Sequence, residues 1–307
     1  MEKKTQYDLV ILGGGPAGVT AALYGARAGL SVVIIENKAV GGEIVSTDRL
    51  DNYPAFPEGI SGVEFGELLE RQMEQLNVPV HFGEVEKVFL DGEIKTVSTS
   101  AGDFLGRNVL IATGTEPNFL GAEGEAELRG RGVSYCATCD AAFFRNKTIA
   151  VVGGGDAALE ETIFLSRFAE KIYLIHRRDK FRGCSWLQEK VLALPGVEVL
   201  WNTTVSKIEG EKRVSKLIIK QDGQDRELAV DGIFIYAGRR PNLAFLEEGA
   251  VKLDDRGFVI TSEKMETSLP GVYAAGDIRR KFLRQVITAA SDGAIAATAV
   301  AQKTFSY

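Results

Sequence analysis

The hydrophobic and polar positions of this chain follow a pattern that occurs twice. A short apolar run, Val10 to Leu12, leads into three glycines, and the same order returns 140 residues later as Ala150 to Val152 followed by Gly153 to Gly155. Each copy ends in a second apolar run, Val32 to Ile35 in the first and Ile172 to Ile175 in the second. Apolar runs bounded by glycine are typical of buried strands, and the segment between them is long enough for a helix. The pattern therefore predicts two strand–turn–helix–strand units.

Two such units predict an α/β protein with two Rossmann-like, doubly wound nucleotide-binding domains, because this order builds a parallel sheet with a crossover helix. Turn residues break the apolar pattern at Thr113 to Pro117 and at Gly238 to Asn242. We expect these breaks to bracket an inserted domain, residues 116–244, within a domain formed by residues 1–115 and 245–307. An alanine-rich stretch, Val286 to Gln302, has high helix propensity and is assigned to the discontinuous domain.

The composition of the chain excludes some classes of protein. The 307 residues are 45% hydrophobic and 25% charged, which are ordinary globular values. The formal net charge of −6 disfavours a nucleic-acid surface, which needs basic residues to replace phosphate counterions. No apolar run approaches the roughly 18 residues that span a bilayer. Lys3 and Lys4 precede an apolar run as in a signal peptide, but this run continues straight into the glycine turn, so we expect no cleaved leader.

The first glycine turn has the spacing Gly13-x-Gly15-x-x-Gly18 between a predicted strand and a predicted helix. Glycines in this context allow the backbone to approach a pyrophosphate, and the helix start offers N–H groups and partial positive charge. Glu36 ends the next strand, where a carboxylate can accept hydrogen bonds from ribose hydroxyls. The turn therefore predicts a dinucleotide site, which either FAD or NAD could occupy.

The second turn has the variant spacing Gly153-x-Gly155-x-x-Ala158, and His176 stands where the first copy has Glu36. Three basic residues follow His176, namely Arg177, Arg178 and Arg182. A basic run is more often a solvated loop than a binding site. At the ribose-reading position, however, a change from acid to base favours a ribose 2′-phosphate, and hence NADP(H).

A single Cys-x-x-Cys motif, Cys136 and Cys139, lies just upstream of the second turn. A structural zinc site needs about four ligands, and the remaining candidates are only Cys184, His81 and His176. A redox disulfide needs only the two sulfurs, so we expect redox chemistry and no metal. Three cysteines do not form the disulfide framework of a secreted protein, which favours the cytoplasm.

Together these motifs resemble the low-molecular-weight thioredoxin reductases of bacteria and archaea, which are pyridine nucleotide-disulfide oxidoreductases of class II. The resemblance spans essentially the whole chain and is carried by Gly13 to Gly18, Ala112-Thr113-Gly114, Cys136-Ala137-Thr138-Cys139-Asp140, Gly153 to Ala158, His176-Arg177-Arg178-Asp179-x-Phe181-Arg182, Gly276-Asp277 and Arg284-Gln285-Val286. It implies FAD at the first turn, NADPH at the second, and a cytoplasmic homodimer that reduces thioredoxin or a thioredoxin-like protein.

The resemblance also assigns roles to single residues. It places Cys139 nearer the flavin, has Cys136 attack the partner's disulfide, and makes Asp140 the proton donor and acceptor. It places Asp277 on the ribityl chain of the flavin and directs the helix that starts near Val286 at the flavin pyrimidine. The other residues that we expect at the cofactors are Pro16, Ala17, Gly42, Asn52, Ala112, Thr113, Gly114, Asp156, Gly276, Arg284 and Gln285. The resemblance further implies rotation of the inserted domain about its two connections, with Gly114 and Gly238 as hinges.

A few positions depart from the family pattern. Glu43 follows Gly41-Gly42 where the family often has glutamine, and it either alters the flavin potential or faces solvent. Cys184 has no remaining partner cysteine, so we expect an ordinary small side chain there.

Related proteins of the same architecture give alternative functions. A ferredoxin–NADP reductase would lack the cysteine pair, and a relative reduced by ferredoxin would be expected to lose the arginines. A reductase of a glutaredoxin-like or other small disulfide protein remains an alternative. So does a non-catalytic nucleotide sensor, which would not need the cysteines.

Overall fold

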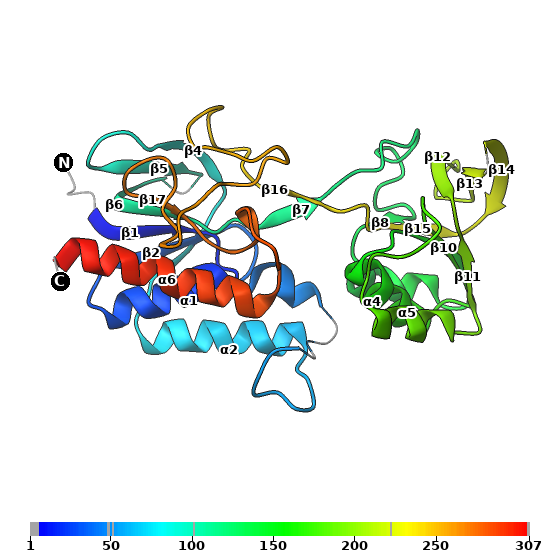
Figure 1. The fold of residues 1–307 in the computed structure, drawn as a ribbon, viewed down its shortest axis with the longest axis horizontal. Helices are drawn as coiled ribbons and strands as arrows, with labels where there is room; N and C mark the ends of the chain where they lie inside the picture. Colours follow the sequence, from blue (N-terminus) through cyan, green and yellow to red (C-terminus); the bar gives the residue numbers. More distant parts are fainter. Residues whose placement is uncertain (1–5, 48–49, 51, 101, 222, 306–307) are drawn as a thin grey trace. The chain divides into compact units, whose positions relative to one another are not determined.

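The computed structural model describes residues 6–47, 50, 52–100, 102–221 and 223–305, so Lys3 and Lys4 lie outside the described residues. The chain divides into a first unit, Met1–Glu116 with Arg240–Tyr307, and a second unit, Pro117–Arg239 (Figure 1). The second unit is therefore inserted into the first. Each unit is built on a largely parallel sheet, which confirms the predicted α/β class with two Rossmann-like domains.

The first unit contains β1 (Gln6–Leu12), α1 (Pro16–Arg27), β2 (Val32–Glu36), the 3-10 helix η1 (Gly42–Ser46), α2 (Gly62–Gln75), β3 (Val80–Phe82), β4 (Val85–Phe89), β5 (Lys95–Thr99), β6 (Gly102–Ile111), β17 (Val272–Ala274), the 3-10 helix η3 (Gly276–Ile278) and α6 (Val286–Phe305). Its sheet has the strand order β3-β2-β1-β6-β5-β4. β1, β2, β3 and β6 run parallel, whereas β4 and β5 are antiparallel to their neighbours. The predicted C-terminal helix begins at Val286 as expected.

Strand β17 returns the C-terminal segment to this sheet. It pairs in parallel with the end of β6, so that Ala274 lies opposite Ile111, and Ile111 in turn lies opposite Leu12 of β1. Parallel strands end at the same edge of a sheet. The turn that follows β17 and the first glycine turn therefore begin at one edge.

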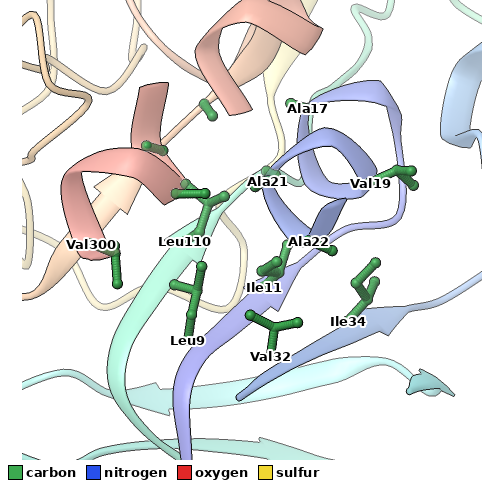
Figure 2. Packing of buried hydrophobic residues seen from close by; sticks show 14 of the residues in the cluster. Leu9, Ile11, Ala17, Val19, Ala21, Ala22, Val32, Ile34, Leu110 and Val300 are labelled. Carbon is green, nitrogen blue, oxygen red and sulfur yellow. The ribbon is translucent and has the colours of Figure 1, made fainter. Parts of the chain in front are cut away.

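Helices α1 and α6 cover one face of the sheet and pack closely against each other. Figure 2 shows the buried side chains of this layer, which include Leu9, Ile11, Ala17, Val19, Ala21, Ala22, Val32, Ile34, Leu110 and Val300. A Cβ at Gly293 of α6 would lie 2.0 Å from the carbonyl oxygen of Ala17. The two helix backbones thus approach as closely as glycine permits, and this contact fixes α6 relative to the first turn.

The second unit contains β8 (Val133–Ser134), α3 (Ala137–Asp140), the 3-10 helix η2 (Ala141–Phe144), β9 (Thr148–Val152), α4 (Asp156–Leu165), β10 (Lys171–Ile175), α5 (Ser185–Leu192), β11 (Val197–Leu200), β12 (Thr203–Glu209), β13 (Lys216–Gln221), β14 (Gln224–Ala229) and β15 (Gly232–Ile235). Its main sheet is parallel and has the order β11-β10-β9-β15-β8. Strands β12, β13 and β14 form a separate antiparallel sheet. One apolar cluster buries Val151 and Phe234 with Leu159 of α4.

The two connecting segments, β7 (Thr115–Pro117) and β16 (Arg239–Pro241), pair with each other as a two-stranded sheet. The units divide at 116/117 and 239/240, whereas the expected boundaries were 115/116 and 244/245, so the main difference is at the second boundary. The difference has a physical reason, because Arg240 Nε lies 3.0 Å from Glu116 Oε1 and Asn242 N–H donates to Gly114 O at 3.1 Å, which ties this stretch to the first unit. In the described part of the chain no helix has the length and apolar character of a membrane span.

Candidate functional site

The first glycine turn joins β1 to α1 with a backbone that excludes larger residues. Gly13 has a φ of +105°, and a Cβ there would lie 2.5 Å from the carbonyl oxygen of Ala112. A Cβ at Gly18 would lie 1.9 Å from the carbonyl oxygen of Gly13. Pro16 opens α1, where a missing N–H is tolerated, and Ala17 is buried. The N–H groups of this first helical turn have no intrahelical acceptor and can bind an anion.

The carboxylate of Glu36 lies beside this turn. Glu36 ends β2, is 6% exposed, and accepts a hydrogen bond from the N–H of Gly14 through Oε2 at 2.6 Å. The chain after β2 passes over the turn, because Gly41 N–H donates to Gly14 O at 2.8 Å and a Cβ at Gly42 would lie 3.0 Å from the Cα of Gly15. Glycine backbone with a carboxylate at its side suits a pyrophosphate next to a ribose with free hydroxyls.

The residues that follow β6 lie beside the first glycine turn. Ala112 N–H donates to Leu12 O at 2.8 Å, and Thr113 Oγ1 donates to Asn242 O at 2.7 Å. Gly114 has a φ of +64°, a conformation that favours glycine, at the point where the chain leaves this unit. Ala112 and Thr113 therefore lie beside the first glycine turn.

The turn after β17 packs against the start of α1. Gly276 has a φ of +82°, and a Cβ there would lie 3.0 Å from the Cβ of Ala17. Arg284 donates through Nε to the carbonyl oxygen of Asp277 at 3.3 Å, and its guanidinium carbon lies 3.9 Å from the ring centroid of Phe258. The side chain of Arg284 thus braces the backbone of the turn.

The start of α6 is brought to the same place by a contact between distant residues. Asn52 Nδ2 donates to Gln285 Oε1 at 3.0 Å across 233 positions of sequence. Val286, the first residue of α6, packs against an apolar cluster that includes Ile44 of η1. Glu43, in η1, is exposed. The predicted residues of the first site are thereby gathered around the start of α1.

The second glycine turn repeats this geometry in the second unit. A Cβ at Gly153 would lie 2.9 Å from the carbonyl oxygen of Tyr236 and 2.6 Å from the Cβ of Ala158. Gly155 caps α4, and Asp156 is the first residue of that helix. Asp156 Oδ1 accepts a hydrogen bond from the N–H of Cys184 at 2.7 Å. Asp156 therefore fixes the following loop onto the turn.

His176 lies against this turn and, unlike the three arginines, is buried. It is 4% exposed, its Nε2 lies 3.0 Å from the carbonyl oxygen of Lys180, and a Cβ at Gly154 would lie 2.4 Å from its ring. Burial lowers the pKa of His176 below its ordinary value, and Arg182 and Arg177 act in the same direction. A neutral, buried imidazole supports the turn from below and adds no positive charge to an anion site.

Arg177, Arg178 and Arg182 are all exposed. Within the described residues their guanidinium groups make no hydrogen bond or ion pair, so their donors are available to an anion. The backbone N–H of Arg182 donates to Gly154 O at 2.6 Å. The second turn thus holds Arg182 at its side through the main chain alone. Four residues were expected at the ribose 2′-phosphate. Three of them are exposed arginines with available donors, and the fourth, His176, is a buried side chain that contacts the turn.

Cys136 and Cys139 form a disulfide, as the resemblance implies, with their Cα atoms 5.4 Å apart. Cys136 precedes α3, and Cys139 N–H donates to its Sγ at 3.2 Å. Cys136 is half-buried and Cys139 is exposed. Ser134 Oγ accepts from the N–H of Cys136 at 3.1 Å, which fixes the chain before the pair. In the part of the chain that the structure describes, no three His, Cys, Asp or Glu side chains gather as metal ligands.

Tyr236 is a residue of this site that the sequence did not reveal. It follows β15, and its hydroxyl oxygen accepts a hydrogen bond from the N–H of Ala137, the first residue of α3, at 3.1 Å. Burial raises the pKa of Tyr236 above its ordinary value, and the carboxylates of Glu161 and Asp140 raise it further. Asp140 therefore lies near this phenol at the end of α3, the redox helix, which begins directly after Cys136 and contains Cys139. A polar residue at the end of a strand in a parallel sheet was the available signal.

A second missed group lies on the chain before the cysteines. Glu125 is 3% exposed and accepts hydrogen bonds from Leu120 N–H at 3.0 Å, from Gly121 N–H at 2.8 Å and from the hydroxyl of Tyr135 at 2.6 Å. Tyr135 directly precedes Cys136. This buried carboxylate thus anchors the segment that leads into the disulfide.

Known proteins resemble the chain over nearly its whole length. Residues 7–293 match the pyridine nucleotide-disulphide oxidoreductase family. The thioredoxin reductase of Listeria monocytogenes is 45% identical over 294 residues, which cover 94% of this chain and 91% of that protein. The thioredoxin reductase of Bacillus subtilis is 42% identical over 303 residues, covering 98% and 95%.

Solved structures agree with these relatives. The thioredoxin reductase of Lactococcus lactis has a TM-score of 0.94 at 38% identity and covers 98% of this chain and 100% of its own. That of T. acidophilum has a TM-score of 0.92 at 31% identity, covering 98% and 99%. The chain belongs to the pyridine nucleotide-disulphide oxidoreductase family and, within it, to the low-molecular-weight thioredoxin reductases.

Proposed function

We propose that this protein is a thioredoxin-disulfide reductase that passes electrons from NADPH through FAD and the Cys136–Cys139 disulfide to oxidised thioredoxin. Family membership establishes the use of a flavin and a pyridine nucleotide. The observation that carries the finer assignment is a disulfide in the same unit as a nucleotide turn that is flanked by arginines with available donors.

The first unit suits FAD. Its glycine turn leaves room for a pyrophosphate at the start of α1, and Glu36 supplies a carboxylate at the ribose position. A carboxylate there accepts hydrogen bonds from ribose hydroxyls and repels a 2′-phosphate, which disfavours NADPH. Asp277 follows β17 near the sheet edge where the first turn begins, and Gln285 precedes α6; we expect both to contact the flavin half.

The second unit suits NADPH. The guanidinium groups of Arg177, Arg178 and Arg182 are exposed beside the second turn, where a ribose 2′-phosphate would lie. Guanidinium groups bind phosphate through charge-assisted hydrogen bonds. A relative whose reductant is not a pyridine nucleotide would not need them.

The two cysteines supply the sulfur chemistry, and bound FAD supplies two-electron transfer to their disulfide. On reduction the disulfide takes up two electrons and two protons, its S–S bond breaks, and two thiols form. The Cys136 thiolate then attacks one sulfur of the thioredoxin disulfide, which forms a mixed disulfide and releases a thioredoxin thiolate. Cys139 attacks the sulfur of Cys136, so the original disulfide reforms and reduced thioredoxin leaves. Asp140, next to Cys139, exchanges the protons.

We further propose a cytoplasmic homodimer. The support is similarity to bacterial thioredoxin reductases along the whole chain. Tyr24 of α1 and Ile295 of α6, two helices that pack side by side, are 48% and 39% exposed and offer apolar surface for a second copy. Light scattering should give the mass of two chains, and the mass of one chain would contradict the dimer.

Two half-reactions of the purified holoprotein test the reductase assignment. We expect NADPH, and not an equal concentration of NADH, to bleach the flavin absorbance, and we expect the colour to return only after oxidised thioredoxin is added. Cys139→Ser should keep the first half-reaction and abolish the second. Cys184→Ser is the matched control, because Cys184 is an exposed free thiol of the same unit and should leave both half-reactions at the wild-type rate.

The other outcomes are equally informative. Loss of both half-reactions in Cys139→Ser would contradict the proposed order of electron transfer. Turnover with a glutaredoxin-like protein but not with thioredoxin would replace the partner. Bleaching without turnover on any disulfide protein would identify a nucleotide sensor.

A further inference from the structure

A buried carboxylate joins helix α6 to the turn that follows β17. Asp292, in the second turn of α6, is 4% exposed. Its Oδ2 accepts hydrogen bonds from Gly276 N–H at 3.0 Å, Arg279 Nε at 2.9 Å and Lys281 Nζ at 2.6 Å. Its Oδ1 accepts from Arg279 Nη2 at 3.0 Å. One carboxylate thus receives four donors, and all four come from residues 276–281.

The part of α6 that carries this carboxylate is fixed by its contact with α1. The next residue, Gly293, packs so closely on α1 that a Cβ would lie 2.0 Å from the carbonyl oxygen of Ala17. Arg279 is itself fixed, because its Nη1 donates to Thr261 Oγ1 at 3.1 Å. On the other side of the turn Arg284 donates to the carbonyl oxygens of Asp277 and Arg279. The Gly276–Asp277 turn is therefore held by the Asp292 carboxylate of α6 and by the guanidinium group of Arg284, which follows the turn in the sequence.

We propose that Asp292 is a positioning residue for the flavin: it sets the Gly276–Asp277 turn against α1 so that the start of α6 and the Asp277 side chain face the same cofactor. The inference rests on the proposed binding of FAD to the first unit. The turn is short, because Gly276 has a left-handed backbone and η3 is a single 3-10 turn. Backbone hydrogen bonds between Val259 and residues 278 and 280 fix its far end, and Asp292 fixes its start through Gly276 N–H.

The charges explain why an ion cluster serves this purpose. Burial alone would raise the pKa of Asp292, but the hydrogen bonds from Arg279 and Lys281 lower it below its ordinary value. These two cations are the charged groups that face the carboxylate, since α1 presents the backbone of Ala17 and Ala21 to this part of α6. Buried ion clusters add little net stability but demand one geometry, because breaking one leaves an uncompensated buried charge. The role of Asp292 is thus to fix the position of the Gly276–Asp277 turn, not to add net stability.

Asp292→Asn tests the proposal on protein stripped of FAD and retitrated with it. The amide keeps the size of the side chain but removes the charge that two cations require. We expect the FAD dissociation constant to rise at least about tenfold while the circular dichroism of the apoprotein is unchanged. Asp8→Asn is the matched control, because Asp8 also accepts a backbone N–H in the first unit, from Ser31 at 2.9 Å, but lies at the start of β1. Its FAD affinity should stay within about twofold of the wild type.

Lys281→Met keeps the proposal testable if Asp292→Asn does not fold. It removes one cation and leaves the paired hydrogen bonds from Arg279 to Asp292. A lowered carboxylate pKa contributes stability above the ordinary aspartate pKa, and this is lost as pH falls through the lowered value. With Lys281 gone the pKa of Asp292 rises, so FAD should be released at a higher pH than from the wild type.

The outcomes separate this inference from the proposed function. Unchanged FAD affinity in folded Asp292→Asn, or identical release curves for Lys281→Met and the wild type, would overturn the positioning role and leave the reductase intact. If the wild-type chain binds no FAD at all, the proposed function itself fails.

Discussion

A Cβ on the first glycine of either nucleotide turn would collide with the backbone of a neighbouring strand, at Ala112 O for Gly13 and at Tyr236 O for Gly153. The residues Ala112 and Tyr236 are equivalent, since each N–H donates at 2.8 Å to the last residue of the strand before its turn. The loop crossing each turn is equivalent too. Gly41 donates to the second glycine of the first turn, and Arg182 donates to that of the second.

The two turns therefore share a backbone and differ in the side chains that surround it. Where the first has the buried acid Glu36, the second has the buried neutral His176. Where the first has Gly41, the second has an arginine whose side chain is free to bind. A shared backbone of this kind suits a nucleotide, whereas a few neighbouring side chains decide which nucleotide it favours and what lies next to it.

The largest expected effect comes from the last position of the glycine spacing, which is Gly18 in the first turn and Ala158 in the second. Gly18→Ala should destabilise the first unit by at least about 3 kcal/mol, because its Cβ would lie 1.9 Å from a backbone oxygen that cannot move aside. Ala158→Gly should cost only about 1 kcal/mol, the helix propensity difference. Thermal unfolding and the FAD content of the purified proteins measure both. Equal losses of stability in the two variants would mean that the two turns tolerate a Cβ at this position equally well.

The next effect concerns the arginines. Arg182→Ala should raise the NADPH KM about 10- to 100-fold, because a hydrogen bond between charged groups contributes about 1.5–3 kcal/mol, and it should leave the NADH KM within about twofold. The backbone bond from Arg182 to Gly154 survives the truncation, so the turn keeps its shape.

Lys180→Ala is the control for this change, because Lys180 is an exposed cation of the same loop. It should change neither KM by more than about twofold. If Arg182→Ala weakened NADPH and NADH equally, the basic run would be a solvated loop and the coenzyme assignment would be lost.

The sequence predicted what the backbone requires. Glycines at Gly13, Gly18 and Gly153 are needed wherever a strand turns this tightly into a helix, so their spacing identified both turns and the fold. The disulfide was predictable for a similar reason, because the spacing of Cys136 and Cys139 brings the two sulfurs within bonding reach.

Contacts made by the folded chain were beyond such reasoning. His176 was expected with the arginines, but Phe181 and Trp201 lie against its ring, at centroid distances of 5.6 and 6.1 Å, and leave it buried. Asp292 meets its cations 11 and 13 residues away across the turn, a spacing that no helix or strand pattern specifies. Such contacts depend on how elements pack, and a single sequence does not reveal that.

The smallest expected effect sharpens the contrast between Ala112 and Tyr236. Tyr236→Phe removes the oxygen that accepts from Ala137 N–H and keeps the ring, so the redox helix loses one hydrogen bond at its first residue. Because burial raises the pKa of Tyr236, the hydroxyl is neutral at physiological pH and no charge is lost. The loss should be about 1 kcal/mol, or about fivefold faster amide exchange of the peptide that contains Ala137.

Hydrogen exchange read by mass spectrometry can localise this change. The peptide over Gly153 to Ala158 should exchange as in the wild type, since the backbone bond from Tyr236 to Val152 remains. Tyr24→Phe is the control, because Tyr24 is 48% exposed on α1, and it should leave both peptides unchanged. Faster exchange in both peptides of Tyr236→Phe would show that the phenol supports the whole turn, and the second unit would then couple its redox helix to its nucleotide turn in a way that the first unit, with alanine at this position, does not.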